Sequence, residues 1–174
     1  MQFLKLTILS SLLFAFALSF TSCEKEDEKK KGGSIFSKTE IPVTGAQSVP
    51  ATPSTATGSL SVTYNKASRQ LSYTVTWTGL TDTIRAIEIY GPAPTGYGSA
   101  TVKQASPGFS SNLKTNQANF PYQAGSYTGS LFADEVVIKE LDILNHLYYL
   151  SIRTKAYGAA PGAPGEIRGQ IRFQ

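Results

Sequence analysis

The chain has 174 residues, of which 41% are apolar and 16% are charged, and it contains one cysteine and one histidine. This length fits one domain of ordinary size, and a single cysteine excludes a disulfide framework within the chain. One Cys and one His also exclude a structural zinc site built by this chain alone, and a net charge of +4 is too small to indicate nucleic-acid binding.

The first 22 residues have the pattern of a bacterial signal peptide. Lys5 follows the amino terminus, and residues 6–20 form an apolar run that is shorter than a membrane-spanning helix requires. Ser22 then places a small residue directly before Cys23, which resembles a lipobox. We therefore expect cleavage before Cys23 and acylation of its thiol, palmitate included, with an ordinary secretory signal as the alternative. Several acyl chains would anchor the protein to a membrane permanently.

A charged segment follows the cysteine. Residues 24–31 are four acids and four lysines, which cannot bury apolar surface, so we predict a disordered tether over residues 23–40. Acids placed directly after the lipidated cysteine resemble the export signal of Bacteroidota surface lipoproteins; a soluble spacer is the alternative. We expect a protein of the bacterial cell envelope that is anchored to the outer membrane and displayed at the surface.

Residues 41–174 have the two-residue period of β-strands. Apolar and polar residues alternate in five segments, which are residues 59–64, 71–78, 86–90, 149–153 and 166–173. Alternation of this kind gives each strand one buried and one exposed face, as in antiparallel sheets. We predict an all-β domain over residues 41–174, an eight-stranded antiparallel sandwich.

One segment has a helical period instead. Val137, Leu141 and Leu144 are spaced by four and three residues, and Asp134 is a suitable N-cap. We predict one short helix within residues 134–145, with this apolar stripe in the core.

Three loops are candidates for function. Residues 91–98 and 155–165 are rich in Gly and Pro, and carry Tyr97 and Tyr157 respectively. Residues 104–125 are polar and have no clear period, which predicts a long loop. Aromatic residues on loops are typical of recognition sites for sugars or peptides.

Four motifs occur in order along the domain: VTGAQSVP at residues 43–50, AIEIYGPA at 86–93, YYLSIRT at 148–154 and PGEIRGQI at 164–171. Together they resemble the CHRD domain, named for its occurrence in chordin, with Ser48 where the family usually has Glu. The resemblance covers residues 41–174. It implies a Greek-key β-sandwich of immunoglobulin-like type that is similar to copper/zinc superoxide dismutase.

The resemblance also identifies a difference from the family. Family members carry histidines at the positions of Glu88, Tyr90 and Arg153, a set suited to binding a metal. A guanidinium has no lone pair to donate and a neutral phenol is a poor ligand, so we expect no metal and no other cofactor. We predict instead that Glu88 pairs with Arg153 beside Tyr90, as a structural replacement. The single histidine, His146, is expected to be structural or solvated.

A binding role for the basic residues is the functional alternative. Arg153, Lys155, Arg168 and Arg172 could form a patch for an anion or glycan beside Tyr97 and Tyr157, although charged residues on strand faces are usually only solvated.

No catalytic constellation is recognisable in the sequence. Glu166 has no second carboxylate at a fixed spacing, and no Gly-x-Ser-x-Gly motif occurs. We therefore expect a non-catalytic binding or structural module, whose partners are the membrane and a surface protein or glycan, without nucleic acid. The alternatives are a metal-dependent redox enzyme and an accessory subunit of a surface complex. Asp82-Thr83-Ile84 also resembles an acceptor for Bacteroidota O-glycosylation.

Overall fold

The computed structural model describes residues 34–99, 101–105, 123–158 and 164–173. The chain divides after Ser34, and the fold described below is that of the unit that begins at Ile35. Within the described residues, no helix has the length and apolarity needed to cross a membrane. The predicted signal peptide, Cys23 and the charged residues 24–31 lie outside the described residues.

The described fold consists of eight strands, one 3₁₀ turn and one short helix. The strands are β1 (Ile35–Thr44), β2 (Thr57–Asn65), β3 (Gln70–Thr78), β4 (Ile84–Tyr90), β5 (Val102–Ala105), β6 (Ala124–Phe132), β7 (Tyr149–Thr154) and β8 (Ile167–Gln170). The 3₁₀ turn η1 (Gly45–Gln47) follows β1, and the helix α3 (Glu140–Leu144) precedes β7. The predicted all-β class with one short helix is confirmed.

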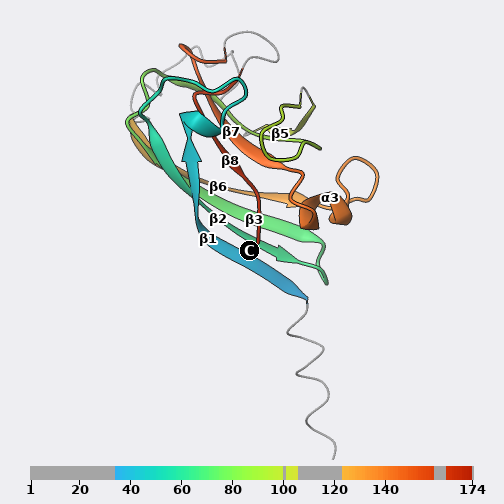
Figure 1. Cartoon of the computed structure of the whole chain (residues 1–174). Coiled ribbons are helices and arrows are strands. Elements are labelled where there is room, and N and C mark those ends of the chain that lie inside the picture. Colours follow the sequence, from blue (N-terminus) through green and yellow to red (C-terminus); the bar gives the residue numbers. More distant parts are fainter. Residues whose placement is uncertain (1–33, 100, 106–122, 159–163, 174) are drawn as a thin grey trace, which may run out of the picture. The chain divides into compact units, whose positions relative to one another are not determined.

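All eight strands belong to one antiparallel sheet, in the order β5-β4-β7-β8-β1-β2-β3-β6. The sheet curls round a common interior into a nearly closed barrel (Figure 1). Gln104 of the edge strand β5 helps to close it, because its side chain accepts a hydrogen bond from the Tyr73 hydroxyl (2.9 Å) and donates one to the Ser130 carbonyl of the other edge strand. The two edges are therefore linked through side chains.

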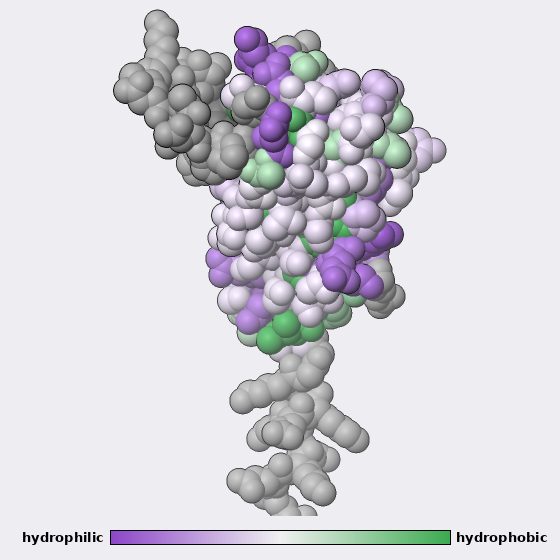
Figure 2. Space-filling model, turned by 90° about the vertical axis from the view of Figure 1, so that its left-hand side faces the viewer, coloured by the Kyte–Doolittle hydropathy of each residue, from purple (hydrophilic) through white to green (hydrophobic). Residues whose placement is uncertain are grey.

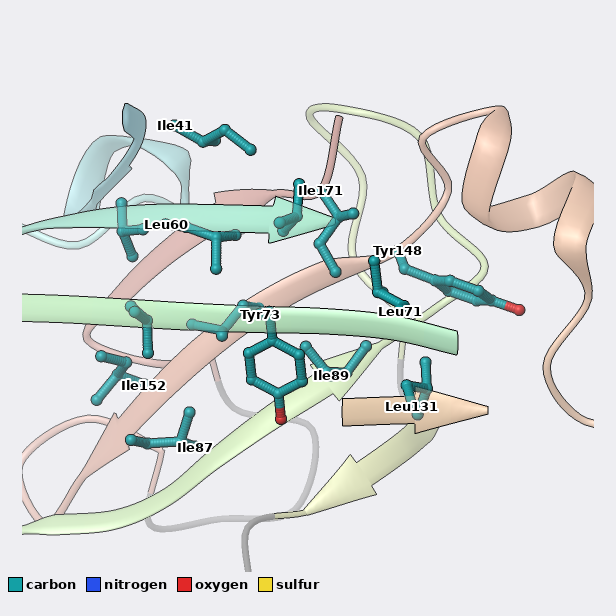
Figure 3. Close-up of a cluster of buried hydrophobic side chains, with 14 of the residues drawn as sticks. Ile41, Leu60, Leu71, Tyr73, Ile87, Ile89, Leu131, Tyr148, Ile152 and Ile171 are labelled. Atoms are coloured by element: carbon teal, nitrogen blue, oxygen red, sulfur yellow. The ribbon is translucent and has the colours of Figure 1, made fainter. Parts of the chain in front are cut away.

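The interior is filled by the apolar half of each alternating strand. On β2 and β3, Leu60 lies opposite Val75 and Val62 opposite Tyr73, and all four side chains are buried. Ile87, Ile89 and Ile152 face them from the other half of the barrel (Figure 3). Burying a side chain of this kind contributes about 1.5–3 kcal/mol, so this interior is the main source of stability.

The outer face of β2, β3 and β6 is uncharged and mostly polar, with the exposed Phe132 at the end of β6. Ser and Thr alternate with the buried residues on these strands, and Thr74 hydrogen-bonds Thr128 across the β3–β6 pair (2.9 Å). Figure 2 shows one face of the molecule on which residues of intermediate hydropathy predominate, with small scattered hydrophilic and hydrophobic areas.

The domain starts earlier than the sequence predicted. Strand β1 begins at Ile35, so residues 35–40, which we had assigned to the tether, belong to β1. Residues 35–38 pair with β2, from Ile35 opposite Asn65 to Lys38 opposite Val62, and the register shifts between Lys38 and Ile41. Strands β5 and β6 were also missed, because their residues fell within or next to the predicted loop of residues 104–125. Residues 106–122 of that loop lie outside the described residues.

The predicted helix is shorter than expected and its buried face is different. The Asp134 carboxylate accepts backbone N–H groups of Val136, Val137 and Ile138 at 2.8–2.9 Å, which closes a turn rather than starting a helix. Glu135 has a positive φ of 62°, which a helix does not allow. The helix therefore begins only at Glu140.

The predicted apolar stripe is consequently wrong. Val137 is 53% exposed and Leu141 is 69% exposed, whereas Leu144 packs partly against the core. The fully or nearly buried residues of this segment are Ile138 and Ile143. The turn at Asp134 changes which residues face inward, and the helical period of the sequence could not show this.

Candidate functional site

A second buried layer lies on the outer face of β4, β7 and β8. The two-residue period directs Ile87, Ile89, Leu150 and Ile152 inward, and the intervening residues outward. We call these outward residues the outer polar layer; they are Glu88, Tyr90, Tyr149, Ser151, Arg153, Arg168 and Gln170. The strand register joins them, because Ser151 lies opposite both Glu88 and Arg168, and Tyr149 lies opposite both Tyr90 and Gln170.

Loops cover this layer and exclude most water from it. The segment after β4 folds back over the sheet, where the Ser99 N–H donates to the Tyr149 hydroxyl, which in turn donates to the Ser99 carbonyl (both 3.0 Å). The segment after η1 is tied to the start of β8, since the Ser48 hydroxyl donates to the Gly165 carbonyl (2.9 Å). As a result Glu88 is only 7% exposed, although it stands on an outward face.

The predicted pair of Glu88 and Arg153 forms. One terminal nitrogen of Arg153 lies 3.2 Å from Glu88 Oε2 and 3.5 Å from Oε1, and the Tyr90 hydroxyl donates to the same carboxylate. Arg153 also donates from Nε to the Gly158 carbonyl (3.0 Å), which ties the loop after β7 to the sheet. The pair is therefore part of a network, in which Glu88 is buried and Arg153 is partly buried.

The electrostatics of this cluster favour its charged form. Burial by itself lowers the pKa of the Arg153 guanidinium, but Glu88 reverses the effect and the net pKa is raised. Burial, and then the Glu88 carboxylate, raise the pKa of the Tyr90 phenol. Arg153 thus stays ionised and Tyr90 stays protonated at neutral pH.

These three side chains do not fit a metal ion. The only anionic group is Glu88, and its oxygens already accept bonds from a guanidinium and a phenol. Arg153 brings a positive charge to the place where a cation would sit. Among the described residues, no group of three or more His, Cys, Asp or Glu side chains is placed to hold a metal ion.

Arg168 lies on the other side of Tyr149. The rings of Tyr90 and Tyr149 stack at 5.4 Å between centroids and 9° between planes. The guanidinium carbon of Arg168 lies 3.5 Å from the Tyr149 ring centroid, a cation–π geometry. Arg168 also donates to the Tyr97 carbonyl (2.7 Å) and the Gln170 side chain (2.9 Å). Because β7 lies between β4 and β8, Tyr149 joins the two halves of the layer.

The other predicted residues are not gathered at one place. β4 and β7 are antiparallel, so the loops that carry Tyr97 and Tyr157 leave the sheet at opposite ends. The Tyr97 side chain is exposed, and the Tyr157 backbone hydrogen-bonds Thr154. Lys155 and Arg172 are exposed outside the layer, so the predicted basic patch of four residues does not form.

His146 has a structural environment, as expected. Its carbonyl accepts a hydrogen bond from the Gln170 amide, and its ring packs on Phe173, with 6.2 Å between centroids. The Phe173 N–H points at His146 Nε2 (3.5 Å).

The segment GEIRGQ, residues 165–170, is buried along its whole length and leads into the loop-covered outer polar layer. The CHRD domain matches residues 39–171. The chain belongs to the CHRD domain family. No curated protein and no solved structure matches it.

Glu166 holds together one end of this CHRD domain. Its side chain is fully buried, and its carboxylate accepts hydrogen bonds from the Ser54 hydroxyl (2.8 Å), the Thr81 N–H (2.9 Å) and the Thr154 hydroxyl (2.8 Å). Its backbone carbonyl accepts from the Thr52 hydroxyl (2.7 Å). Glu166 thus connects three segments that are far apart in the sequence. The sequence analysis considered this residue only as a catalytic acid and missed its structural role.

We expect the CHRD domain to lose stability above pH 10. Burial raises the pKa of the phenols of Tyr64, Tyr73 and Tyr90, and raises that of Tyr148 to about 12. An unfolded tyrosine titrates near pH 10, so the folded state holds these protons to higher pH than the unfolded state. Their stabilising contribution is complete below pH 10 and declines as the pH rises towards 12, by up to about 1.4 kcal/mol per pH unit for each phenol.

Urea unfolding at pH 9 and pH 11 measures this loss. Tyr148→Phe should reduce the loss between the two pH values, because one of the four titrating phenols is removed. Equal free energies of unfolding at pH 9 and pH 11 in the wild-type protein would show that the buried phenols titrate as they do in the unfolded chain.

Proposed function

We propose that this protein is a lipid-anchored lipoprotein of the bacterial cell envelope, and that its CHRD domain is a non-catalytic binding module. The observation that supports a non-catalytic binding function is how the charged groups in and beside the outer polar layer are paired. The carboxylates of Glu88 and Glu166 accept hydrogen bonds from donors within the fold, whereas the Arg168 guanidinium has only neutral partners among the described residues. An engaged carboxylate is a poor general base, but a buried cation with neutral partners can bind an anion.

The difference from the family pattern supports the same proposal. Where the CHRD pattern has histidines, this chain has Glu88, Tyr90 and Arg153, which hold one another in place. We regard this cluster as a structural replacement that fixes β4 against β7. Stoichiometric copper, zinc or iron in the purified protein would contradict this proposal and support a metal-dependent redox enzyme.

The sequence features before the fold support the anchor. Ser22 and Cys23 follow an apolar run of signal-peptide length, and Cys23 is the only cysteine of the chain. Eleven residues, 24 through 34, separate it from the start of β1 at Ile35. The acidic residues directly after Cys23 support display on the outer surface of a Bacteroidota-like cell.

Replacing Cys23 with Ala should release the protein from the membrane. The thiol is the atom that would carry the diacylglycerol, and each buried methylene of an acyl chain contributes about 0.8 kcal/mol to membrane binding. Labelling cells with radioactive palmitate and partitioning the lysate in Triton X-114 measures both lipid and anchoring. We expect label and detergent-phase recovery for the wild type and neither for Cys23→Ala.

Ser22→Ala is the matched control, because it keeps a small residue before the cysteine and should be processed normally. Full recovery of Cys23→Ala in the detergent phase would contradict the anchor. Protease treatment of intact cells then tests the orientation, since a surface-displayed domain is degraded and a periplasmic one is protected.

A further inference from the structure

Arg168 is a buried cation without an acidic partner. It is 3% exposed, and it is absent from the ion pairs formed within the described residues, which are Lys66–Glu140 and Arg153–Glu88. Buried charges are normally paired, because removing a charge from water is costly. Arg153 lies on the same face, two residues along β7 from Ser151, the residue opposite Arg168, and it has such a partner in Glu88. Arg168 therefore differs from its neighbour in a way that needs an explanation.

The neutral contacts of Arg168 hold its side chain in place without neutralising it. A guanidinium has five N–H donors, and two of them are used on the Tyr97 carbonyl and the Gln170 amide oxygen. The remaining three make no hydrogen bond to a described residue. Burial lowers the pKa of Arg168, which reflects the cost of keeping this charge out of water, yet a guanidinium remains protonated at any physiological pH.

Two adjoining hollows have Arg168 in their walls. The smaller has a volume of about 150 Å³ and also contacts Ser99 and Ser151; the larger has a volume of about 380 Å³ and also contacts Gln47 and Thr95. Both hollows share Ser48 and Val49 with each other. A ligand could therefore place a small charged group in the first hollow and its body in the second.

Ser151 is a second, independent sign of a ligand at the smaller hollow. It is 3% exposed, lies directly opposite Arg168 in the β7–β8 pair, and its hydroxyl makes no hydrogen bond to a described residue. Among the described residues no fully buried side-chain oxygen or nitrogen lacks a hydrogen-bond partner, so the Ser151 hydroxyl reaches the open space of the hollow. The Ser151 hydroxyl and the remaining N–H donors of Arg168 thus lie in the wall of the same hollow.

We propose that Arg168 and Ser151 form a binding site for the carboxylate of a small organic acid, with the body of the ligand in the larger hollow. This proposal deepens the proposed binding function by naming the chemistry of the ligand. A carboxylate carries one negative charge, which one guanidinium balances, and its oxygens match the N–H and O–H donors. A phosphate monoester carries about −1.5 to −2 and calls for further cations, but no described Lys or second Arg lines either hollow.

Isothermal titration calorimetry on the full mature protein in detergent tests the site with three acids. Acetate fills only the smaller hollow, whereas glucuronate and N-acetylalanine also reach the larger one. We expect saturable binding of one equivalent, weakest for acetate, and no binding of inorganic phosphate of comparable strength. The acid with the lower dissociation constant, glucuronate or N-acetylalanine, identifies a sugar acid or a peptide-like acid as the natural source of the carboxylate.

Ser151→Ala is the decisive variant. Because its hydroxyl has no hydrogen-bond partner among the described residues, its removal should leave the ligand-free melting temperature unchanged and weaken carboxylate binding about tenfold, as expected for a hydrogen bond to a charged group. Arg168→Lys should weaken binding at least as much. Arg172→Gln removes one charge from an exposed position of the same segment and should bind like the wild type.

The site is overturned if no acid binds saturably, if phosphate binds and carboxylates do not, or if Ser151→Ala binds as tightly as the wild type. These outcomes are independent of the fate of Cys23→Ala. Failure of the carboxylate site therefore leaves the membrane anchor standing, and failure of the anchor does not affect the titration.

Discussion

Glu166→Ala is expected to lower the free energy of unfolding by about 2–4 kcal/mol, because the buried Thr154 hydroxyl and the more accessible donors of Ser54 and Thr81 lose their acceptor together and the side chain leaves a cavity. Glu166 is fully buried, and its carboxylate receives Ser54, Thr81 and Thr154. Each unsatisfied buried group costs about 1–3 kcal/mol, and water can relieve part of this cost by entering the cavity left by the side chain. Urea unfolding followed through the fluorescence of the single tryptophan, Trp77, measures the change.

Two milder variants separate the contribution of the carboxylate from that of the volume. Glu166→Gln keeps the size, and its amide oxygen can still accept from Ser54 and Thr81, which both bond to Oε1 in the wild type. We expect a loss of about 1–2 kcal/mol for this variant, since only the Thr154 contact must be rearranged. Thr154→Val removes the same contact from the other side and should cost about as much. A loss below about 1 kcal/mol for Glu166→Ala would show that the three segments are held in place by other contacts.

The strands that the sequence predicted correctly are those with apolar residues on the inner face. On β3 every inward residue is large and apolar, and on β2 every one except Gly58, so the two-residue period is unmistakable. Strand β6 has no such signal, because two of its inward positions are Gly125 and Gly129. A Cβ at Gly125 would lie 2.7 Å from the Trp77 ring, and one at Gly129 would lie 2.4 Å from the Tyr73 hydroxyl. The large rings of β3 occupy the space in front of β6, and this pairing cannot be derived from β6 alone.

The candidate site was predictable only as far as strand geometry determines it. The period places Glu88 and Arg153 on outward faces of strands, and the predicted ion pair followed once β4 and β7 were taken as neighbours. The burial of the pair and of Arg168 arises from the loops after β4 and η1, which fold back over the sheet. Their positions depend on long-range contacts such as Tyr97 with Arg168 and Ser48 with Gly165, which no local pattern encodes.

The Glu88–Arg153 pair should show strong coupling in a double-mutant cycle. Arg153→Met leaves the Glu88 carboxylate buried with only the Tyr90 hydroxyl as a described side-chain partner, and we expect a loss of about 2–4 kcal/mol. This loss is smaller than the loss expected when a fully buried ion pair is broken, because the Arg153 side chain is partly accessible to water. Glu88→Gln in the same background removes the unpaired charge and should restore part of the loss, giving a coupling energy of about 1–3 kcal/mol.

The Lys66–Glu140 pair, with 3.3 Å between Nζ and Oε1, is more accessible to water than the Arg153–Glu88 pair and is the control within the chain. Lys66→Met should cost less than about 1 kcal/mol, because water solvates the carboxylate that remains. Additive effects of Glu88→Gln and Arg153→Met would contradict a coupled pair. A cost for Arg153→Met as small as that for Lys66→Met would mean that water reaches Glu88, so that the loops do not seal the outer polar layer. The comparison of the two pairs therefore tests the burial on which the carboxylate site at Arg168 also depends.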